Sequence, residues 1–280
     1  MHLEDRTFQL KVPDREGRPD PAPLVVAFHG GMATGGAMRK LANLDARAER
    51  EGWLVAYPDS VAGHWNDGRG SAVIHEHRDQ VDDLGWVARL VDHLVETAGA
   101  DRDQVYATGF SNGAMFCHRI AVERPELVAA IAPVAGPMPE PLLDPGPTRA
   151  MPALLVHGTD DPVVPYAGGP VQGDPDRGRV ASVEETAARW RAVNRCSTEG
   201  SVTEVPHRDP ADRTRVRVRR WEPDDDGTGA EVVLVTVEGG GHTWPGGLQY
   251  QPQSRIGVTT GDVHASDLVV DFFRGKTRRA

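Results

Sequence analysis

The sequence predicts an α/β protein built on a mostly parallel, doubly wound β-sheet in a single domain. Short apolar runs typical of buried strands alternate along the chain with segments whose apolar residues recur at helical spacing. The chain has 280 residues, 39% of them hydrophobic and 26% charged, a composition that supports one large core and does not fit a disordered chain. No internal repeat and no linker divides the sequence, so we expect one domain over residues 1–280 with its core at about 24–273.

Strand and helix alternate through the first half of the chain. A continuous apolar run at 24–28, which ends in His29-Gly30-Gly31, is typical of a strand buried on both faces of a parallel sheet. Further apolar runs predict strands at 53–57, 105–110 and 128–134. Apolar residues at helical spacing predict helices at 38–50, 80–97 and 112–123, and a loop rich in Gly, Asp and His covers about 59–79.

The pattern resumes in the second half of the chain. We expect a strand at 153–156, a helix at about 182–194 and a last helix at about 265–273. Between these two helices, the stretches Thr214–Trp221 and Glu231–Glu238 are predicted to form antiparallel strands. Because strands joined through helices run parallel, the sheet is expected to be mostly parallel with this antiparallel addition.

The charge balance argues against one class of partner. Lys and Arg number 31 against 41 Asp and Glu, so the formal net charge is −10 with His neutral. Proteins bind DNA or RNA through basic surfaces that displace condensed counterions. We therefore expect no nucleic-acid partner.

Targeting and redox features favour a cytoplasmic location. No stretch approaches the roughly 20 apolar residues of a membrane helix, so no membrane association is expected. The first residues lack the apolar segment of a secretory signal, although secretion stays open if a leader has been removed. Two cysteines, Cys117 and Cys196, allow at most one disulfide, which fits a reducing compartment.

The motif Gly109-Phe110-Ser111-Asn112-Gly113 carries the first chemical signal. It fits G-x-S-x-G between a predicted strand and a predicted helix, where a sharp turn exposes the Ser oxygen and small residues on either side let the backbone pass closely. The competing interpretation is a Gly-rich turn that packs a helix on the sheet. The strand-turn-helix setting favours Ser111 as a nucleophile.

A Ser hydroxyl needs a His to take its proton and a carboxylate to orient that His. After Ser111, the acid is expected in His157-Gly158-Thr159-Asp160-Asp161-Pro162, which directly follows a predicted strand. Its loop should therefore open at the carboxyl edge of the sheet, where open α/β sheets bind their ligands. Spacing alone does not choose between Asp160 and Asp161, and at least one of them is a turn or cap aspartate.

His242 is the predicted base among the eleven histidines of the chain. Three glycines precede it and Trp244-Pro245 follows, so its loop can hold the imidazole over Ser111. This loop also follows a predicted strand. A lone His is more often packed or solvated, and His264 is the main rival for the role of base.

Tetrahedral intermediates need two N–H donors aimed at the oxyanion. One is expected to be the backbone N–H of Asn112, the residue after the nucleophile. The other should come from the loop His29-Gly30-Gly31-Met32, where glycine permits close backbone approach. A plain tight turn is the competing interpretation of this loop.

Four segments of the chain carry a family resemblance: Gly109–Met115, His157–Tyr166, Gly239–Gly247 and Trp65–Gly70. Together they resemble the polyhydroxybutyrate depolymerase-like and feruloyl-esterase-like family of α/β-hydrolases, from about Leu24 to Phe273. The resemblance implies the α/β-hydrolase fold and hydrolysis of carboxylic esters without a cofactor. It also implies Asp161, the second Asp of its loop, as the acid and Gly31 as the oxyanion donor.

The resemblance further implies a substrate class. Family members act on hydroxycinnamoyl or acetyl esters of plant polysaccharides, or on hydroxyalkanoate esters. Trp65 matches the family and, with Trp244, is expected to shape the acyl pocket, since exposed aromatic side chains often mark binding surfaces. The alternative for Trp65 is that it anchors its own loop.

These observations predict a serine carboxylic ester hydrolase. Ser111, Asp161 and His242 are the expected triad, and no metal or nucleotide is expected because all the reacting groups belong to the protein. A peptidase or an acyltransferase with the same triad is one alternative, since the fold does not fix the acceptor. A non-catalytic binding module is another, disfavoured by the presence of every triad residue type and both oxyanion loops in the order typical of the fold.

Overall fold

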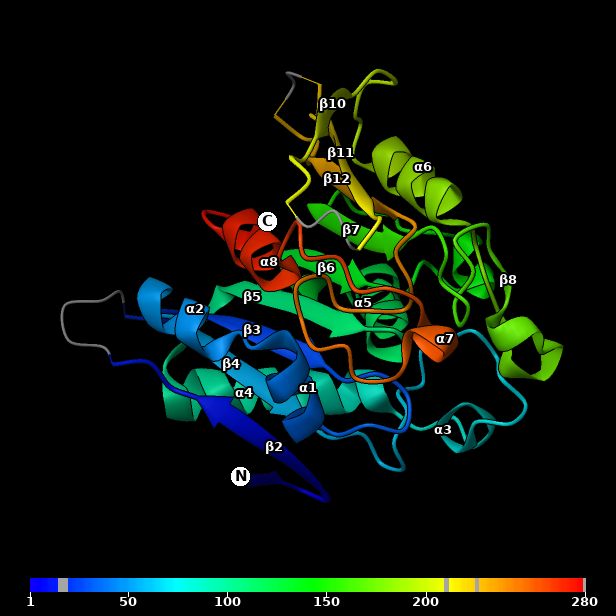
Figure 1. Ribbon diagram of the computed structural model, residues 1–280. Coiled ribbons are helices and arrows are strands. Elements are labelled where there is room, and N and C mark those ends of the chain that lie inside the picture. The colour runs from blue at the N-terminus through cyan, green and yellow to red at the C-terminus, as the bar shows by residue number, and fades with distance from the viewer. Residues whose placement is uncertain (15–19, 209–211, 225–226, 279–280) are drawn as a thin grey trace.

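A ten-stranded β-sheet forms the centre of the protein (Figure 1). The computed structural model describes residues 1–14, 20–208, 212–224 and 227–278. Across the sheet the strands follow the order β1 (His2–Leu3), β2 (Arg6–Lys11), β4 (Leu54–Pro58), β3 (Ala22–Phe28), β5 (Ala100–Phe110), β6 (Ala130–Val134), β7 (Ala153–Gly158), β12 (Val232–Glu238), β11 (Arg215–Trp221) and β10 (Ser201–Glu204). Neighbours from β4 to β12 are parallel, and the outer strands pair antiparallel. The predicted, mostly parallel α/β sheet is confirmed.

Helices cover both faces of this sheet (Figure 1). One face carries α4 (Asp83–Ala98), α5 (Asn112–Glu123) and α6 (Val183–Val193), and the other carries α1 (Gly35–Ala42), α2 (Asp45–Glu51) and α8 (Ala265–Phe273). The long loops contain the short helices α3 (His75–Arg78) and α7 (Gln253–Ile256) and a ribbon of β8 (Gly169–Pro170) and β9 (Arg179–Val180). Within the described ranges, none of the helices has the length and apolar character needed to cross a bilayer.

The central strands contribute side chains to two hydrophobic cores. In β3, Leu24, Val26 and Phe28 pack with α4, α5 and α6. Val25 and Ala27 point to the opposite face and pack with α1, α2 and α8. A strand covered on both faces needs an unbroken apolar run, which is the pattern that the sequence shows at 24–28.

One predicted helix is divided in the structure. The periodic stretch 38–50 forms α1 and α2, because Asn43 adopts a left-handed conformation with φ 48° and ends α1. The first helix also begins earlier than predicted, since the Thr34 side chain accepts a hydrogen bond from Ala37 N at 3.2 Å and caps it. Local capping therefore decides the boundaries that apolar periodicity leaves open.

The sheet margins differ from the prediction in two ways. Strands β11 and β12 pair antiparallel as predicted, but β12 is also parallel to β7 and so extends the parallel part of the sheet. Strands β1, β2 and β10 were not predicted. All four residues of β10 are exposed, and short exposed edge strands leave no apolar pattern in a sequence.

A buried histidine makes the stability of this fold sensitive to acid. His118 on α5 is fully buried, and burial lowers its pKa from 6.5 to about 3. Its Nδ1 accepts a hydrogen bond from Trp190 Nε1 at 3.1 Å. Protonation of Nδ1 would break this bond, because two N–H donors would then face each other. The folded protein thus holds this imidazole neutral where the unfolded chain binds a proton.

We expect the free energy of unfolding to fall as the pH drops from 6.5 towards 3, because protons bind preferentially to the unfolded chain in that window. His118 contributes at most about 1.4 kcal/mol per pH unit there. Urea unfolding at about pH 7 and about pH 5 measures the loss, which should be smaller in His118→Gln. An identical pH dependence in the two proteins would contradict this role of His118.

Candidate active site

Ser111 lies at a sharp turn between the end of β5 and the start of α5. Its backbone has φ 57° and ψ −118°, an unusual conformation for a residue with a side chain. The N–H of Ser111 donates to Val134 O on the neighbouring strand at 2.9 Å, and Ser111 O accepts from Met115 N at 3.0 Å. Residues held in such conformations cluster at functional sites, where the surrounding structure fixes them.

Two glycines of the G-x-S-x-G motif make this turn possible. A Cβ at Gly109 would lie 2.5 Å from the backbone of Gly113, and a Cβ at Gly113 would lie 2.4 Å from Phe28 O. The ends of β3 and β5 and the first turn of α5 therefore approach more closely than any larger residue allows. These contacts explain why glycine stands two positions before and two positions after Ser111.

His242 and Asp161 form a hydrogen-bonded pair. His242 Nδ1 lies 2.7 Å from Asp161 Oδ2, and both side chains are buried. Asp161 Oδ1 accepts hydrogen bonds from Val163 N and Val164 N, each at 2.8 Å. His157 Nε2 lies 3.4 Å from Asp161 Oδ2. The bond to Asp161 places a proton on His242 Nδ1 and leaves Nε2 as the basic nitrogen.

The surroundings of Asp161 keep its carboxyl ionised. Burial alone would raise the pKa of Asp161, but the charge of His242 and the hydrogen bonds from His157 and His242 outweigh it and hold this pKa well below its usual range. The ionised carboxylate can stabilise a positive charge on His242.

Asp160 and His264, the alternative candidates for the acid and the base, lie outside the hydrogen-bonded pair of Asp161 and His242. The side chain of Asp160 is exposed and accepts a hydrogen bond from Thr159 Oγ1 at 2.9 Å. His264 immediately precedes α8, where the charges of Arg47 and Asp267 act on it. Neither Asp160 nor His264 lines the cavity that contains Ser111 and His242.

The loop that carries His242 is fastened to the segment around α7. His242 N donates to Ile256 O at 2.5 Å, and Gly241 N donates to Val258 O at 3.0 Å. Tyr250 Oη donates to His242 O at 3.1 Å. A Cβ at Gly241 would lie 2.0 Å from Ile256 O, so this contact requires glycine.

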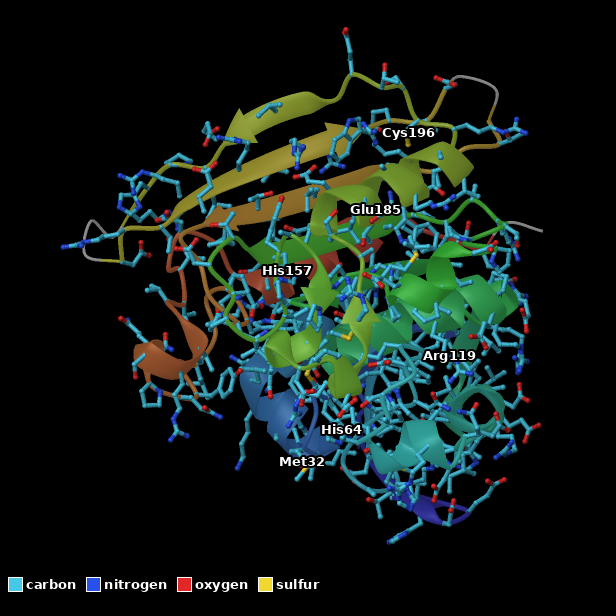
Figure 2. The ribbon with its side chains drawn as sticks, turned by 90° about the vertical axis from the view of Figure 1, so that its right-hand side faces the viewer. Met32, His64, Arg119, His157, Glu185 and Cys196 are labelled. Atoms are coloured by element: carbon cyan, nitrogen blue, oxygen red, sulfur yellow. The ribbon has the colours of Figure 1, made fainter. Side chains whose placement is uncertain are left out.

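The loop after β3 lies against the turn at Ser111. A Cβ at Gly30 would lie 3.4 Å from Ser111 Cβ, and a Cβ at Gly31 would lie 2.6 Å from His64 Nε2. Met32 N donates to Gly63 O at 2.7 Å, and Figure 2 shows Met32 and His64 as neighbours at one edge of the molecule. The backbone of this loop thus passes beside Ser111 at Gly30.

The side chain of Asn112 joins a further loop to this turn. Its Oδ1 accepts from Trp65 N at 2.7 Å, and its Nδ2 donates to Trp65 O at 2.9 Å and to Asp67 Oδ2 at 2.6 Å. Asp67 forms a buried ion pair with Arg69. The sequence predicts a role only for the backbone of Asn112, because nothing in its pattern pairs position 112 with 65–69.

Both tryptophans expected to contact substrate lie beneath the site. Trp65 and Trp244 are fully buried and do not line the cavity. Trp65 stacks on Phe116 with ring centroids 5.2 Å apart and donates to His29 O at 3.1 Å. Trp244 donates to Ser266 Oγ at 3.0 Å. The geometry gives the expected substrate-binding role no support and favours the alternative that Trp65 anchors its own loop.

A cavity of about 660 Å³ brings the candidate residues together. Ser111, His242, Gly31 and Asn112 all line it. Within the described part of the chain, no hydrogen bond joins the side chains of Ser111 and His242, although both residues line the same cavity. The volume suits a small organic ligand.

One group of potential metal ligands stands apart from this cavity. In the residues that the structure describes, His207, Asp212 and Asp262 have ligand atoms within 4.8 Å of one another. Asp262 accepts hydrogen bonds from His207 Nδ1 and Arg208 N, and Asp212 accepts from backbone N–H groups. The two carboxylates thus already have hydrogen-bond partners that join neighbouring loops, and these partners account for the clustering of the three residues.

The fold and the turn at Ser111 define an α/β-hydrolase. Residues 16–171 match the model of a family described as phospholipase/carboxylesterase. The chain belongs to this phospholipase/carboxylesterase family and is a carboxylic ester hydrolase.

Curated relatives and solved structures agree with this assignment. The chain is 32% identical over 281 residues to "Putative esterase NocK" of Nocardia uniformis subsp. tsuyamanensis, covering 96% of this chain and 79% of that protein. It is 26% identical over 247 residues to feruloyl esterase B of Piromyces equi, covering 85% of this chain but only 42% of that protein. The acetyl xylan esterase from Aspergillus awamori shares the fold, with a TM-score of 0.58 and 19% identity over 85% of this chain and 89% of that one. The resemblance to feruloyl-esterase-like hydrolases is confirmed.

We expect Asn112→Ala to lower the free energy of unfolding by about 1–3 kcal/mol, because it removes three hydrogen bonds to the Trp65 backbone and the buried Asp67 carboxylate. Urea unfolding at neutral pH measures the change. Glu96→Ala, at an exposed position on α4, is the control and should change stability by less than about 0.5 kcal/mol. Equal effects of the two substitutions would contradict the role of Asn112 in holding the loop.

Proposed function

We propose that the protein hydrolyses carboxylic esters with Ser111 as nucleophile, His242 as base and Asp161 as the group that orients His242. The observation that carries this proposal is the 2.7 Å hydrogen bond between buried His242 and Asp161, in a pair whose imidazole lines the same cavity as Ser111. In a two-step acyl transfer, one group must take a proton, return it and take another. A His side chain held in a fixed orientation by a carboxylate suits this task.

The proposed reaction begins with attack of Ser111 Oγ on the ester carbonyl carbon. His242 Nε2 takes the hydroxyl proton as the new C–O bond forms, and Asp161 stabilises the resulting imidazolium. The tetrahedral intermediate then collapses: the bond to the alcohol oxygen breaks, and His242 returns its proton to the leaving alcohol. Water then attacks the acyl carbon while His242 takes its proton; the bond between the acyl carbon and Ser111 Oγ breaks, His242 returns the proton to Ser111 Oγ, and the acid leaves.

The oxyanion of each tetrahedral intermediate is proposed to accept hydrogen bonds from the N–H groups of Gly31 and Asn112. Asn112 begins α5, so its N–H belongs to the positive end of a helix dipole. Gly31 lies in the loop held beside Ser111, and both residues line the cavity. Fixed donors of this kind stabilise developing negative charge without reorganising during the reaction.

The proposed substrates are feruloyl or acetyl esters of polysaccharides, or hydroxyalkanoate esters. Support comes from the names of similar proteins, which include a feruloyl esterase and a bifunctional acetylxylan esterase/xylanase. The cavity volume of about 660 Å³ is large enough for an aromatic or short aliphatic acyl group.

Substitution of the nucleophile and base tests the proposal most directly. Ser111→Ala and His242→Ala should each lower kcat on a p-nitrophenyl ester by several orders of magnitude, because triad members act as a unit. His264→Ala is the matched control and should keep most of the activity. A fluorophosphonate probe should label wild-type protein and not Ser111→Ala. Wild-type turnover in Ser111→Ala would overturn the proposal.

The neighbouring aspartates offer a second, sharper test. Asp161→Asn should lower kcat by up to about 10⁴-fold, as the amide can no longer fix the tautomer of His242. Asp160→Asn changes an exposed side chain of the same type one position away and should leave kcat within about twofold. A kcat of Asp161→Asn within about twofold of the wild-type value would mean that the carboxylate paired with His242 does not act in the reaction.

A further inference from the structure

Among the described residues, the Lys, Arg, Asp and Glu side chains that line the cavity are all basic. Four positive residues line it, Lys40, Arg69, Arg177 and Arg255. Within the described residues, no Asp or Glu side chain lines this cavity. This contrasts with the chain as a whole, in which acidic residues outnumber basic ones 41 to 31 and the net charge is −10. The positive lining is therefore a local feature of the site.

Two of the four cations are already balanced by carboxylates. Arg69 is buried and paired with buried Asp67. Arg177 lies near the rim with its Nε 3.7 Å from Asp174 Oδ2, and both of those side chains are partly exposed. These pairs leave little free charge for a ligand.

Lys40 and Arg255 are different, because neither forms an ion pair with any residue that the structure describes. Both side chains are exposed, Lys40 on α1 and Arg255 on α7. The two helices are brought to the same cavity by the loop between His242 and α7: a Cβ at Gly247 in this loop would lie 3.1 Å from Leu41 O, next to Lys40. In Figure 1, α7 lies beyond the carboxyl ends of the central parallel strands.

The rest of the wall near these cations is apolar. Met38, Leu41, Leu248 and Ile256, which neighbour these cations in the chain or in the loop before α7, line the same cavity. Leu248 is 59% exposed, so apolar surface extends to the mouth. A ligand that fills this space would place an apolar portion against these side chains and any anionic group at the rim.

We propose that the preferred substrates are esters that carry a second, anionic group, which Lys40 and Arg255 attract at the rim of the cavity. This inference rests on the proposed esterase function and narrows its substrate class. Cations in a cleft with low-dielectric walls raise the local concentration of anions and speed their association. The anion can belong to the acyl part or to the alcohol part of the ester, and these two sources are distinguished by experiment.

The test compares kcat/KM for matched anionic and neutral esters, each corrected for its rate with hydroxide. In the first pair, p-nitrophenyl hydrogen glutarate carries a carboxylate in its acyl part and p-nitrophenyl pentanoate is its neutral control. In the second pair, 4-acetoxybenzoate carries the carboxylate in its alcohol part and 4-acetoxybenzamide is its neutral control. We expect the anionic ester to be preferred in at least one pair. The preference should decline with rising ionic strength, because the rim charges are exposed to solvent.

Substitutions of Lys40 and Arg255 test whether these two side chains cause the preference for anionic esters. Lys40→Gln and Arg255→Gln should each lower the anionic-to-neutral ratio of kcat/KM by roughly two- to fivefold, the effect of one exposed charge pair. Arg102→Gln removes the same charge from an exposed residue paired with Asp92 and should keep the wild-type ratio.

Each failure has its own meaning. Cleavage of the neutral esters with no preference for either anionic ester, or a ratio that both rim variants leave unchanged, would overturn this inference and leave the proposed function standing. Cleavage of none of the four esters would overturn the proposed function and the substrate class with it.

Discussion

The close approach of backbone segments around Ser111 is the constraint on which the rest of the site depends. Gly113 packs on Phe28 O, and Gly136 packs on Ser111 O, where a Cβ would lie only 2.4 Å away in each case. Packing this tight leaves the turn no room to relax to an ordinary conformation. It therefore fixes where the Ser111 hydroxyl and the first N–H groups of α5 point. The loop after β3 is held beside the same turn, with Gly30 against Ser111.

The order of the strands explains how two distant residues join this turn. Asp161 and His242 are separated by 81 positions, but the strands that precede them, β7 and β12, are parallel neighbours. The loops that leave adjacent parallel strands emerge side by side, and here a Cβ at Gly158 would lie 2.2 Å from Gly240 O. The pairing of β12 with β7 thus does more than extend the sheet, because it brings the carboxylate and the imidazole within hydrogen-bonding distance.

The sequence predicts those features that leave a local pattern. Continuous apolar runs predict the buried strands, and glycine spacing predicts the turn at Ser111. The pairing of β12 with β7 leaves no such pattern, since strand order is set by tertiary packing. Nor does the local spacing distinguish Asp161 from Asp160: burial and the N–H groups of Val163 and Val164 do. The sequence leaves open whether Trp65 contacts substrate or anchors its loop, because only the tertiary structure shows that its ring stacks on Phe116 in the core.

The two parts of the site differ in how they are held. Ser111 is fixed by the ends of strands, whereas the rim is built from loops and short helices that can vary without disturbing the sheet. His242 belongs to both parts, because its N–H donates to Ile256 O and its carbonyl accepts from Tyr250. Arg255 is adjacent to Ile256 in the chain. We therefore expect a change in the segment 246–256 that moves Arg255 to move the backbone of His242 as well, which would couple the proposed substrate preference to the position of the proposed base.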